Sequence, residues 1–415
     1  MISKKNILFI ALLVLTNTAM GQVILQTGIW RGALQTSSGN ELPFNFTVTD
    51  TISGQLITII NGDERFKVTD IKSQGDSVFI KMPLFDSEFK LKLTIDSLSG
   101  NWIKHGAYTD AVLPFTAKAN RSYRFFKDPA KTIFDVTGRW SVVFGENEEK
   151  EQVIGEFKQN GNKLTGTFLS TTGDYRFLEG AVNGNKLYLS CFDGGHAYIF
   201  TATISDDNTL TEGLQFAGYS SITKWKGIRN KSAKLPDAYS LTVLKPGYKK
   251  IDFTFKDING QLVSLHDGRF KNKVVIVQIL GSWCPNCMDE TNYFTGGYYK
   301  KYHPLGVEII GLAYERTTDY AKSQKTLMQL KNHFDVPYPL LITGYTPGNG
   351  DPQKSLPMLA NFKGFPTTII IDKNGNVRKI HTGFSGPGTG DYYKEFSEEF
   401  EKLTDNLLAE KAKIK

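Results

Sequence analysis

Cysteine is rare in this sequence, with three residues in a chain of 415. A small exported scaffold held together by disulfides needs several paired cysteines, so this class of protein is excluded. Two of the three cysteines form the run Cys284-Pro285-Asn286-Cys287, a spacing that indicates chemistry rather than architecture. Cys191 stands alone in a strand-like run, and we expect it to fill the core as a small hydrophobic residue.

Long apolar runs are also missing, because no stretch approaches 18 apolar residues. The longest N-terminal run, residues 7–15, would span roughly 14 Å as a helix, against about 30 Å of membrane hydrocarbon. It follows Lys4 and Lys5 and precedes small and polar residues up to Gly21. This pattern predicts a secretory signal peptide over residues 1–21, and hence a protein that is exported and soluble after cleavage.

A strong excess of one charge is absent as well. Lys and Arg number 49 against 42 Asp and Glu, and the surplus is spread along the chain. Such a balance favours solubility and gives no sign of a nucleic-acid partner. We therefore expect no nucleic acid among the partners.

Residues 22 to about 230 alternate apolar and polar side chains between frequent turn signals, which predicts an all-β region. The region also repeats itself. Gly28-Ile29-Trp30 is echoed 110 residues later by Gly138-Arg139-Trp140, and other elements recur at nearly the same offset. The duplication predicts two β-meander units, 22–125 and 126–232, each with about eight strands closed into a small barrel. One large sandwich built from both halves remains the alternative.

The Gly-x-Trp motif that opens each unit resembles the first strand of lipocalin-like barrels. The resemblance implies that Trp30 and Trp140 pack into the barrel floor. A ligand pocket in the β region is the alternative.

Residues 233–250 are polar and form a predicted linker, and residues 251–415 change to an α/β pattern. Asn259-Gly260 marks a hairpin, and the apolar run 274–280 indicates a buried central strand. Residues 343–353 have the composition of an inserted loop. The other predicted elements are strands at 307–313, 338–342, 367–372 and 377–381 and helices at 320–334, 356–362 and 391–411.

This arrangement resembles the thioredoxin fold, and more narrowly the exported TlpA/ResA-type thiol-disulfide oxidoreductases. The resemblance is carried by Trp283-Cys284-x-x-Cys287 after a buried strand, by Glu290, and by Gly364-Phe365-Pro366-Thr367-Thr368 at the start of a strand. It covers about 40% of the chain. The predicted architecture is therefore an all-β N-terminal region followed by an α/β thioredoxin-fold domain.

The position of the cysteines predicts their chemistry. Cys284 falls at the N-cap of a helix and Pro285 at its first position, where a missing N–H costs nothing. Free backbone N–H groups and the positive end of the helix then favour the thiolate of Cys284. We expect Cys284 to attack a substrate disulfide and Cys287 to resolve the mixed disulfide. A zinc site would need further ligands, so we predict no metal.

The resemblance assigns the remaining site residues. Pro366 matches the family's cis-proline, which would leave the Phe365 backbone free to pair with an extended substrate beside the two sulfurs. Trp283 is expected to contact the same substrate. Glu290 matches a glutamate that modulates cysteine protonation. Gln278 replaces the buried acid of cytosolic thioredoxins and cannot exchange protons, which places this task on Glu290 or solvent. The dipeptide Pro285-Asn286 departs from the family, and because this dipeptide tunes the reduction potential, the potential is left open.

The function predicted from these features is a periplasmic thiol-disulfide oxidoreductase without a cofactor. The resemblance implies that it reduces disulfides of exported proteins and is recharged by a membrane-bound electron donor. Two alternatives remain: an envelope binding or assembly protein whose β region holds a small ligand or protein partner, and a thiol peroxidase. The peroxidase reading is weakened because Gly281 stands where its motif requires threonine.

Overall fold

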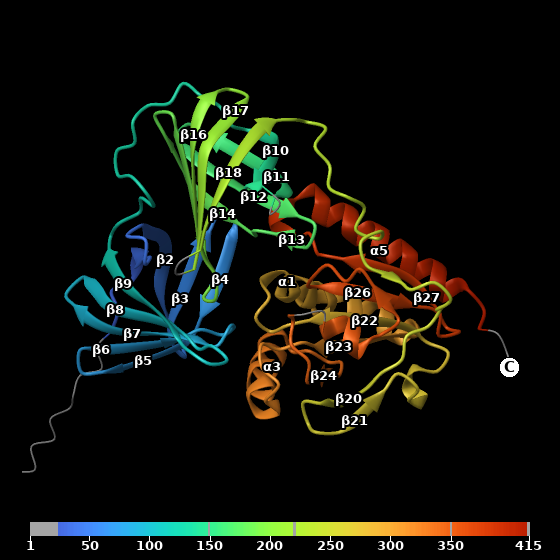
Figure 1. Ribbon diagram of the computed structural model, residues 1–415. Helices are drawn as coiled ribbons and strands as arrows, with labels where there is room; N and C mark the ends of the chain where they lie inside the picture. The colour runs from blue at the N-terminus through green and yellow to red at the C-terminus, as the bar shows by residue number, and fades with distance from the viewer. Residues whose placement is uncertain (1–23, 148–149, 219–220, 349–350, 413–415) are drawn as a thin grey trace, which may run out of the picture.

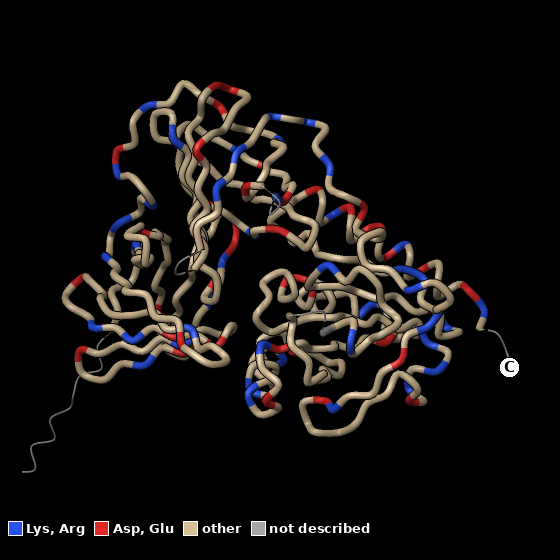
Figure 2. The backbone as a smooth tube through the Cα atoms, in the orientation of Figure 1, with Lys and Arg blue, Asp and Glu red and all other residues tan. Residues whose placement is uncertain are grey.

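The structure is a computed structural model that describes residues 24–147, 150–218, 221–348 and 351–412 (Figure 1). The expected signal peptide, residues 1–21, lies outside the described residues. Lys and Arg are interspersed with Asp and Glu over all parts of the backbone (Figure 2). Within the described chain no helix is long and apolar enough to cross a membrane.

The first β unit is one antiparallel sheet of nine strands that follow one another in a meander. Its first and last strands pair, so β4 and β5 become the two edges of a barrel-like sheet that stays open between them. This unit therefore has one strand more than the eight or so that the sequence predicts. The strands are β1 (Gly28–Gln35), β2 (Glu41–Thr51), β3 (Gly54–Asn61), β4 (Glu64–Val68), β5 (Asp70–Gln74), β6 (Ser77–Lys81), β7 (Ser87–Thr94), β8 (Ser97–Lys104) and β9 (Ala111–Ala119).

The second unit closes completely. Strand β11 pairs with both β10 and β12, which joins eight strands into a ring, and the short β13 pairs with β12 outside that ring. A closed barrel of eight strands is what the sequence predicts here. The strands are β10 (Gly138–Phe144), β11 (Glu151–Asn160), β12 (Lys163–Ser170), β13 (Gly173–Asp174), β14 (Leu178–Asn183), β15 (Lys186–Phe192), β16 (Ala197–Asp206), β17 (Thr209–Ala217) and β18 (Ser221–Arg229).

The internal duplication is visible in the strand register. Trp30 pairs with Ala119 in the first unit, and Trp140 pairs with Arg229 in the second. The two partner residues are thus 110 positions apart in the sequence, as the two tryptophans are. Each indole is fully buried and donates a hydrogen bond to the carbonyl four residues before it. The two tryptophans are thus core residues, as predicted.

The two barrels share part of their cores. Phe192, from the second unit, is fully buried among aromatic rings of the first, including Phe44 and Trp102. The cavity inside the first barrel measures only about 20 Å³, about the space of one water molecule. The interior of this barrel is filled by side chains.

The C-terminal part is a mixed seven-stranded sheet in the order β21-β20-β24-β23-β22-β26-β27. The central strand β22 is buried along its whole length, as its apolar run predicts. The strands are β20 (Thr254–Asp257), β21 (Leu262–Ser264), β22 (Val274–Leu280), β23 (Val307–Ala313), β24 (Leu340–Ile342), β26 (Thr367–Ile371) and β27 (Val377–Thr382). The helices are α1 (Pro285–Tyr293), α2 (Tyr299–Tyr302), α3 (Tyr320–Phe334), α4 (Asp351–Ser355) and α5 (Asp391–Ala409), with shorter helical turns at η2 (Gly268–Phe270), η3 (Phe294–Tyr298), η4 (His303–Leu305) and η5 (Pro387–Thr389).

One predicted element is wrong. The helix expected over 356–362 is absent, and the short helix of this region, α4, lies earlier and begins in the last residues of the predicted loop. Strand β25 (Leu359–Ala360) instead pairs with β19 (Val243–Leu244), which belongs to the predicted linker. A pairing over more than 100 residues leaves no trace in the local pattern, which explains the error.

Candidate redox site

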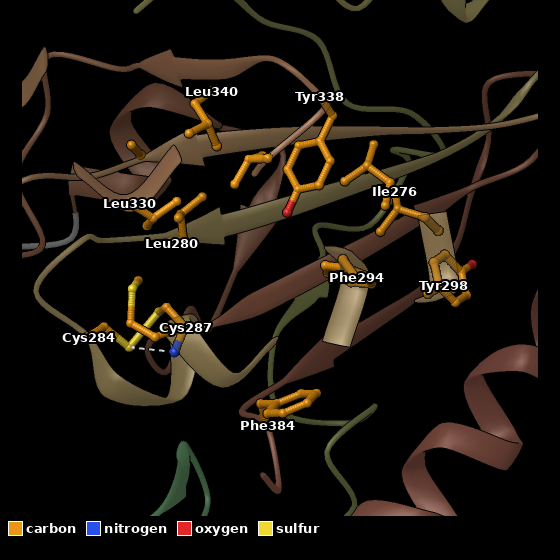
Figure 3. Close-up of a cluster of buried hydrophobic side chains, with 14 of the residues drawn as sticks. Ile276, Leu280, Cys284, Cys287, Phe294, Tyr298, Leu330, Tyr338, Leu340 and Phe384 are labelled. Carbon is orange, nitrogen blue, oxygen red and sulfur yellow. Dashed lines mark hydrogen bonds between the residues drawn. A yellow bond between two sulfur atoms is a disulfide. The ribbon is translucent and has the colours of Figure 1, made fainter. Parts of the chain in front are cut away.

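The cysteine pair lies where the central strand passes into helix α1. Cys284 has extended backbone angles and is the N-cap of the helix, and Pro285 occupies its first turn. The backbone N–H of Cys287 donates a hydrogen bond of 3.2 Å to Sγ of Cys284. The two sulfurs are bonded to each other, and the Cα atoms are 5.2 Å apart (Figure 3). The expected capping geometry is therefore present.

Both cysteines are buried. Cys284 is 4% exposed and Cys287 is not exposed at all, and they belong to an apolar cluster that includes Leu280 and Phe294 (Figure 3). A thiol that must attack another molecule is usually more open than this. What lies over Cys284 therefore decides which molecules can reach it.

Trp283 and Phe365 pack against the apolar cluster that contains both cysteines, and Pro366 follows Phe365 directly. The rings of Trp283 and Phe365 meet edge to face at 5.4 Å, and the Trp283 indole donates to the carbonyl of Tyr314. The Phe365–Pro366 peptide bond is cis, as expected. The Pro366 carbonyl accepts a hydrogen bond of 2.8 Å from the backbone N–H of Gly383.

Glu290 lies one turn after Cys287 and is fully buried. Its carboxylate accepts hydrogen bonds from Oγ1 of Thr368 at 2.6 Å and from Nε2 of Gln278 at 2.9 Å. Burial raises the pKa of Glu290 to about 7, and the two hydrogen bonds oppose this rise. The site thus places a carboxyl group that titrates near neutral pH in the same buried layer as the cysteines.

Sequence reasoning missed Glu315 and Arg316, which follow strand β23. The buried Glu315 carboxylate accepts from the backbone N–H of Ser282 at 2.8 Å and from its hydroxyl at 2.6 Å, which fixes the turn before the cysteines. The Arg316 guanidinium lies 4.7 Å from the centre of the Trp283 ring. Their position at the carboxyl end of a strand beside β22 is a signal that could have revealed them.

The β region supplies further residues that no local pattern indicates. Arg176, from the second β unit, donates to Oδ1 of Asp289 at 2.7 Å and to the carbonyl of Pro285 at 3.4 Å. Its other terminal nitrogen donates to Glu64 of the first unit. The remaining predicted residue, Asn286, contacts Gly173. Residues from three parts of the chain therefore meet at the first turn of α1.

Comparison with known proteins agrees with this geometry. Residues 245–395 match the Redoxin family model. The chain is 30% identical over 164 residues to the thiol-disulfide oxidoreductase ResA of Bacillus thuringiensis subsp. konkukian, which is 40% of this chain and 80% of the relative. It is 28% identical over 142 residues to ResA of Geobacillus kaustophilus, with coverages of 34% and 72%.

Among solved structures, a thiol-disulfide isomerase from Corynebacterium glutamicum aligns with a TM-score of 0.32 and 17% identity, over 40% of this chain and 99% of that one. The Redoxin match, residues 245–395, contains the cysteine pair, Glu290 and Pro366. The chain is a thioredoxin-fold thiol-disulfide oxidoreductase, and it belongs to the ResA family through its C-terminal domain.

Proposed function

We propose that the protein reduces disulfides of other exported proteins through a dithiol–disulfide cycle of Cys284 and Cys287. The observation that carries this proposal is the bonded cysteine pair at the start of α1, in which Cys284 caps the helix. The helix end stabilises negative charge on that sulfur, which makes Cys284 the attacking thiolate and the better leaving group.

The proposed cycle moves two electrons. The Cys284 thiolate attacks one sulfur of the substrate disulfide, a mixed disulfide forms, and the other substrate sulfur leaves as a thiolate and takes up a proton. The Cys287 thiolate then attacks the Cys284 sulfur, which releases the second substrate thiolate and forms the Cys284–Cys287 disulfide. A membrane-bound electron donor is proposed to return the pair to the dithiol with two electrons and two protons.

The roles of the neighbours are part of the same proposal. Trp283, Phe365 and Pro366 would contact the substrate, and Pro285 and Asn286 would tune the reduction potential. Glu290 would exchange a proton with the buried thiol during resolution. Its pKa of about 7 supports this role, because a group that titrates near the working pH can both accept and release a proton.

The direction of the reaction is tested by the reduction potential of the pair, measured on the mature protein in dithiothreitol buffers. A value near −250 mV or lower would support a reductant, since thioredoxin lies at about −270 mV. A value near the −120 mV of a strong periplasmic oxidant would instead make the protein a disulfide donor. Replacing Cys191 with serine is the matched control and should leave the potential unchanged.

Periplasmic export is proposed from the basic and apolar pattern of residues 1–21. We expect the protein secreted by its native host to begin at Gln22, which mass spectrometry of the intact chain would detect. A full-length chain retained in the cytoplasm would refute export. The proposed domain limits are 22–125 and 126–232 for the two β units, 233–250 for the linker and 251–415 for the redox domain. Fragments cut at these limits can be expressed in the same host.

A further inference from the structure

A short stretch of the second β unit lies against the first turn of the redox helix. This covering segment, residues 171–176, connects β12 with β14 and contains β13. Gly173 sits so close to Asn286 that a Cβ atom on Gly173 would lie 2.0 Å from the Asn286 Nδ2 atom. The φ of Gly173 is +145°, a second reason why glycine occupies this position. The backbone of the β unit therefore rests directly on the Cys284–Cys287 turn.

The covering segment also rests on the two loops beside the cis-proline. A Cβ atom on Gly364 would lie 2.6 Å from Cγ2 of Thr172, and one on Gly383 would lie 2.8 Å from the carbonyl oxygen of Thr171. Gly364 comes two residues before Pro366, and Gly383 donates to the Pro366 carbonyl. The segment thus contacts the turn between the two cysteines and both loops next to Pro366, and Cys284 within that turn is 4% exposed.

Charged contacts hold the covering segment in place. Arg176 bridges Asp289 of the redox helix and Glu64 of the first β unit, and all three side chains are largely buried. Asp174 accepts a hydrogen bond of 2.6 Å from the backbone N–H of Gly386. Removing one partner of a buried ion pair is strongly destabilising, because it leaves the other charge buried and unpaired. Arg176 is therefore the strongest single attachment of the segment.

The position of the covering segment on the redox helix also leaves buried polar atoms without hydrogen bonds, which costs free energy. Within the described residues, Nε of Arg176 and Oδ1 of Asn286 are buried and have no hydrogen-bond partner. Each such buried polar atom destabilises the closed arrangement, and water would supply the missing hydrogen bond if the segment moved away. A cleft of about 590 Å³, lined by Ser170, Thr171 and Gly173 among others, runs along the segment. The contact is thus held by the two ion pairs of Arg176 but leaves buried polar atoms of Arg176 and Asn286 without partners, as expected of a cover that can move away.

We propose that the covering segment is a specificity element of the redox site and that Arg176 is the residue that positions it. The segment restricts approach to Cys284, so that a small disulfide reacts readily and a disulfide within a bulky protein reacts only when the segment is displaced. This proposal rests on the proposed function. The exchange reaction itself is unchanged: the same two electrons pass from the cysteine pair to the substrate disulfide.

The test compares two disulfides on the mature full-length protein: hydroxyethyl disulfide as the small substrate and insulin as the bulky one. In Arg176→Gln the rate with insulin should rise about tenfold or more, since loss of the buried pair exceeds the 1.4 kcal/mol that corresponds to tenfold. The rate with hydroxyethyl disulfide should change less than about twofold. The milder Glu64→Gln, which removes one partner of Arg176, should shift the ratio in the same direction.

The matched control is Arg139→Gln. Arg139 also joins the second β unit to the redox domain, through Glu156 and the ring of Tyr392, but it does not contact the cysteine turn. Both of its rates should stay at the wild-type values. Equal acceleration of both substrates by Arg176→Gln, or no change in either, would overturn the proposal. If the wild-type pair cannot be cycled even by dithiothreitol, the proposed function fails instead.

Discussion

The side-chain amide of Gln278 donates a hydrogen bond of 2.9 Å to the carboxylate of Glu290, and both side chains are fully buried. The amide stabilises the charged carboxylate but cannot exchange a proton itself. Burial has a larger effect on the pKa of Glu290 than this hydrogen bond and the one from Thr368, so the pKa rises to about 7. Glu290 therefore changes its charge in the pH range where the protein is expected to work.

We expect Glu290→Gln to remove one inflection from the pH dependence of the rate of disulfide reduction. In the wild type, ionisation of Glu290 near pH 7 adds a negative charge close to the cysteines and opposes formation of the Cys287 thiolate. The rate of insulin reduction, measured between pH 5.5 and 9, should show an inflection near pH 7 that is missing in the variant. If the inflection near pH 7 persisted unchanged in the variant, it would belong to the titration of a group other than Glu290.

The same substitution should change stability with a defined sign. The pKa of Glu290 is raised from 4.5 to about 7, so the folded state binds the proton more tightly and loses stability as the pH rises through this range. The loss is about 3 kcal/mol above pH 7. Glu290→Gln should therefore be more stable than the wild type at pH 8 by up to this amount, with little gain at pH 5.

Urea unfolding of the oxidised protein at both pH values measures this difference. A glutamine can keep both hydrogen bonds, because its oxygen accepts from Gln278 and its amide donates to Thr368. Glu398→Gln, at an exposed position of α5, is the control and should show no comparable pH effect. Equal stability changes at pH 5 and pH 8 would contradict the raised pKa.

Local sequence patterns were sufficient to predict the strand and the helices around the cysteines. The apolar run of β22 and the amphipathic pattern of α3 match the structure residue for residue. The N-cap position of Cys284 also follows from a motif a few residues long, whereas the cis bond before Pro366 was expected from the family resemblance that the run around it carries. Each of these features depends on neighbours in sequence, which is why it could be predicted.

The features that cover the site depend on distant neighbours and could not be predicted in this way. Arg176 meets Asp289 across 113 residues and Glu64 across 112. Its neighbours in the sequence give no sign of these contacts, and only the packing of both β units against the redox domain gives it two buried carboxylate partners. The pairing of Leu359 with Leu244 was missed for the same reason.

The two cysteines should differ in the intermediates that their variants form. Cys284→Ser removes the attacking sulfur and should abolish reduction of any disulfide, whereas Cys287→Ser should retain the first attack and accumulate a mixed disulfide with the substrate. Non-reducing electrophoresis and mass spectrometry would detect the adduct. An adduct formed by Cys284→Ser and not by Cys287→Ser would reverse the two roles.

Cys191 should stay inert in these experiments. Its thiol is buried in the second barrel, and burial raises its pKa well above the usual range, so the thiolate is scarcely populated. Iodoacetamide should label Cys191 only after unfolding, and Cys191→Ala should leave turnover at the wild-type rate. Rapid labelling in the native protein would show that the barrel opens far more often than its packing implies.

Phe192 should couple the stability of the two barrels. Its ring is fully buried and stacks on Phe44 at 4.6 Å, with Phe89 and Trp102 close by. Phe192→Ala would leave a cavity where the second unit enters the first and should cost about 3–5 kcal/mol in the free energy of unfolding. Phe79→Ala, at a ring that is 37% exposed, should cost far less in the same urea titration. Similar losses for both variants would mean that the barrels relax to fill the space, so that Phe192 does not bind them together.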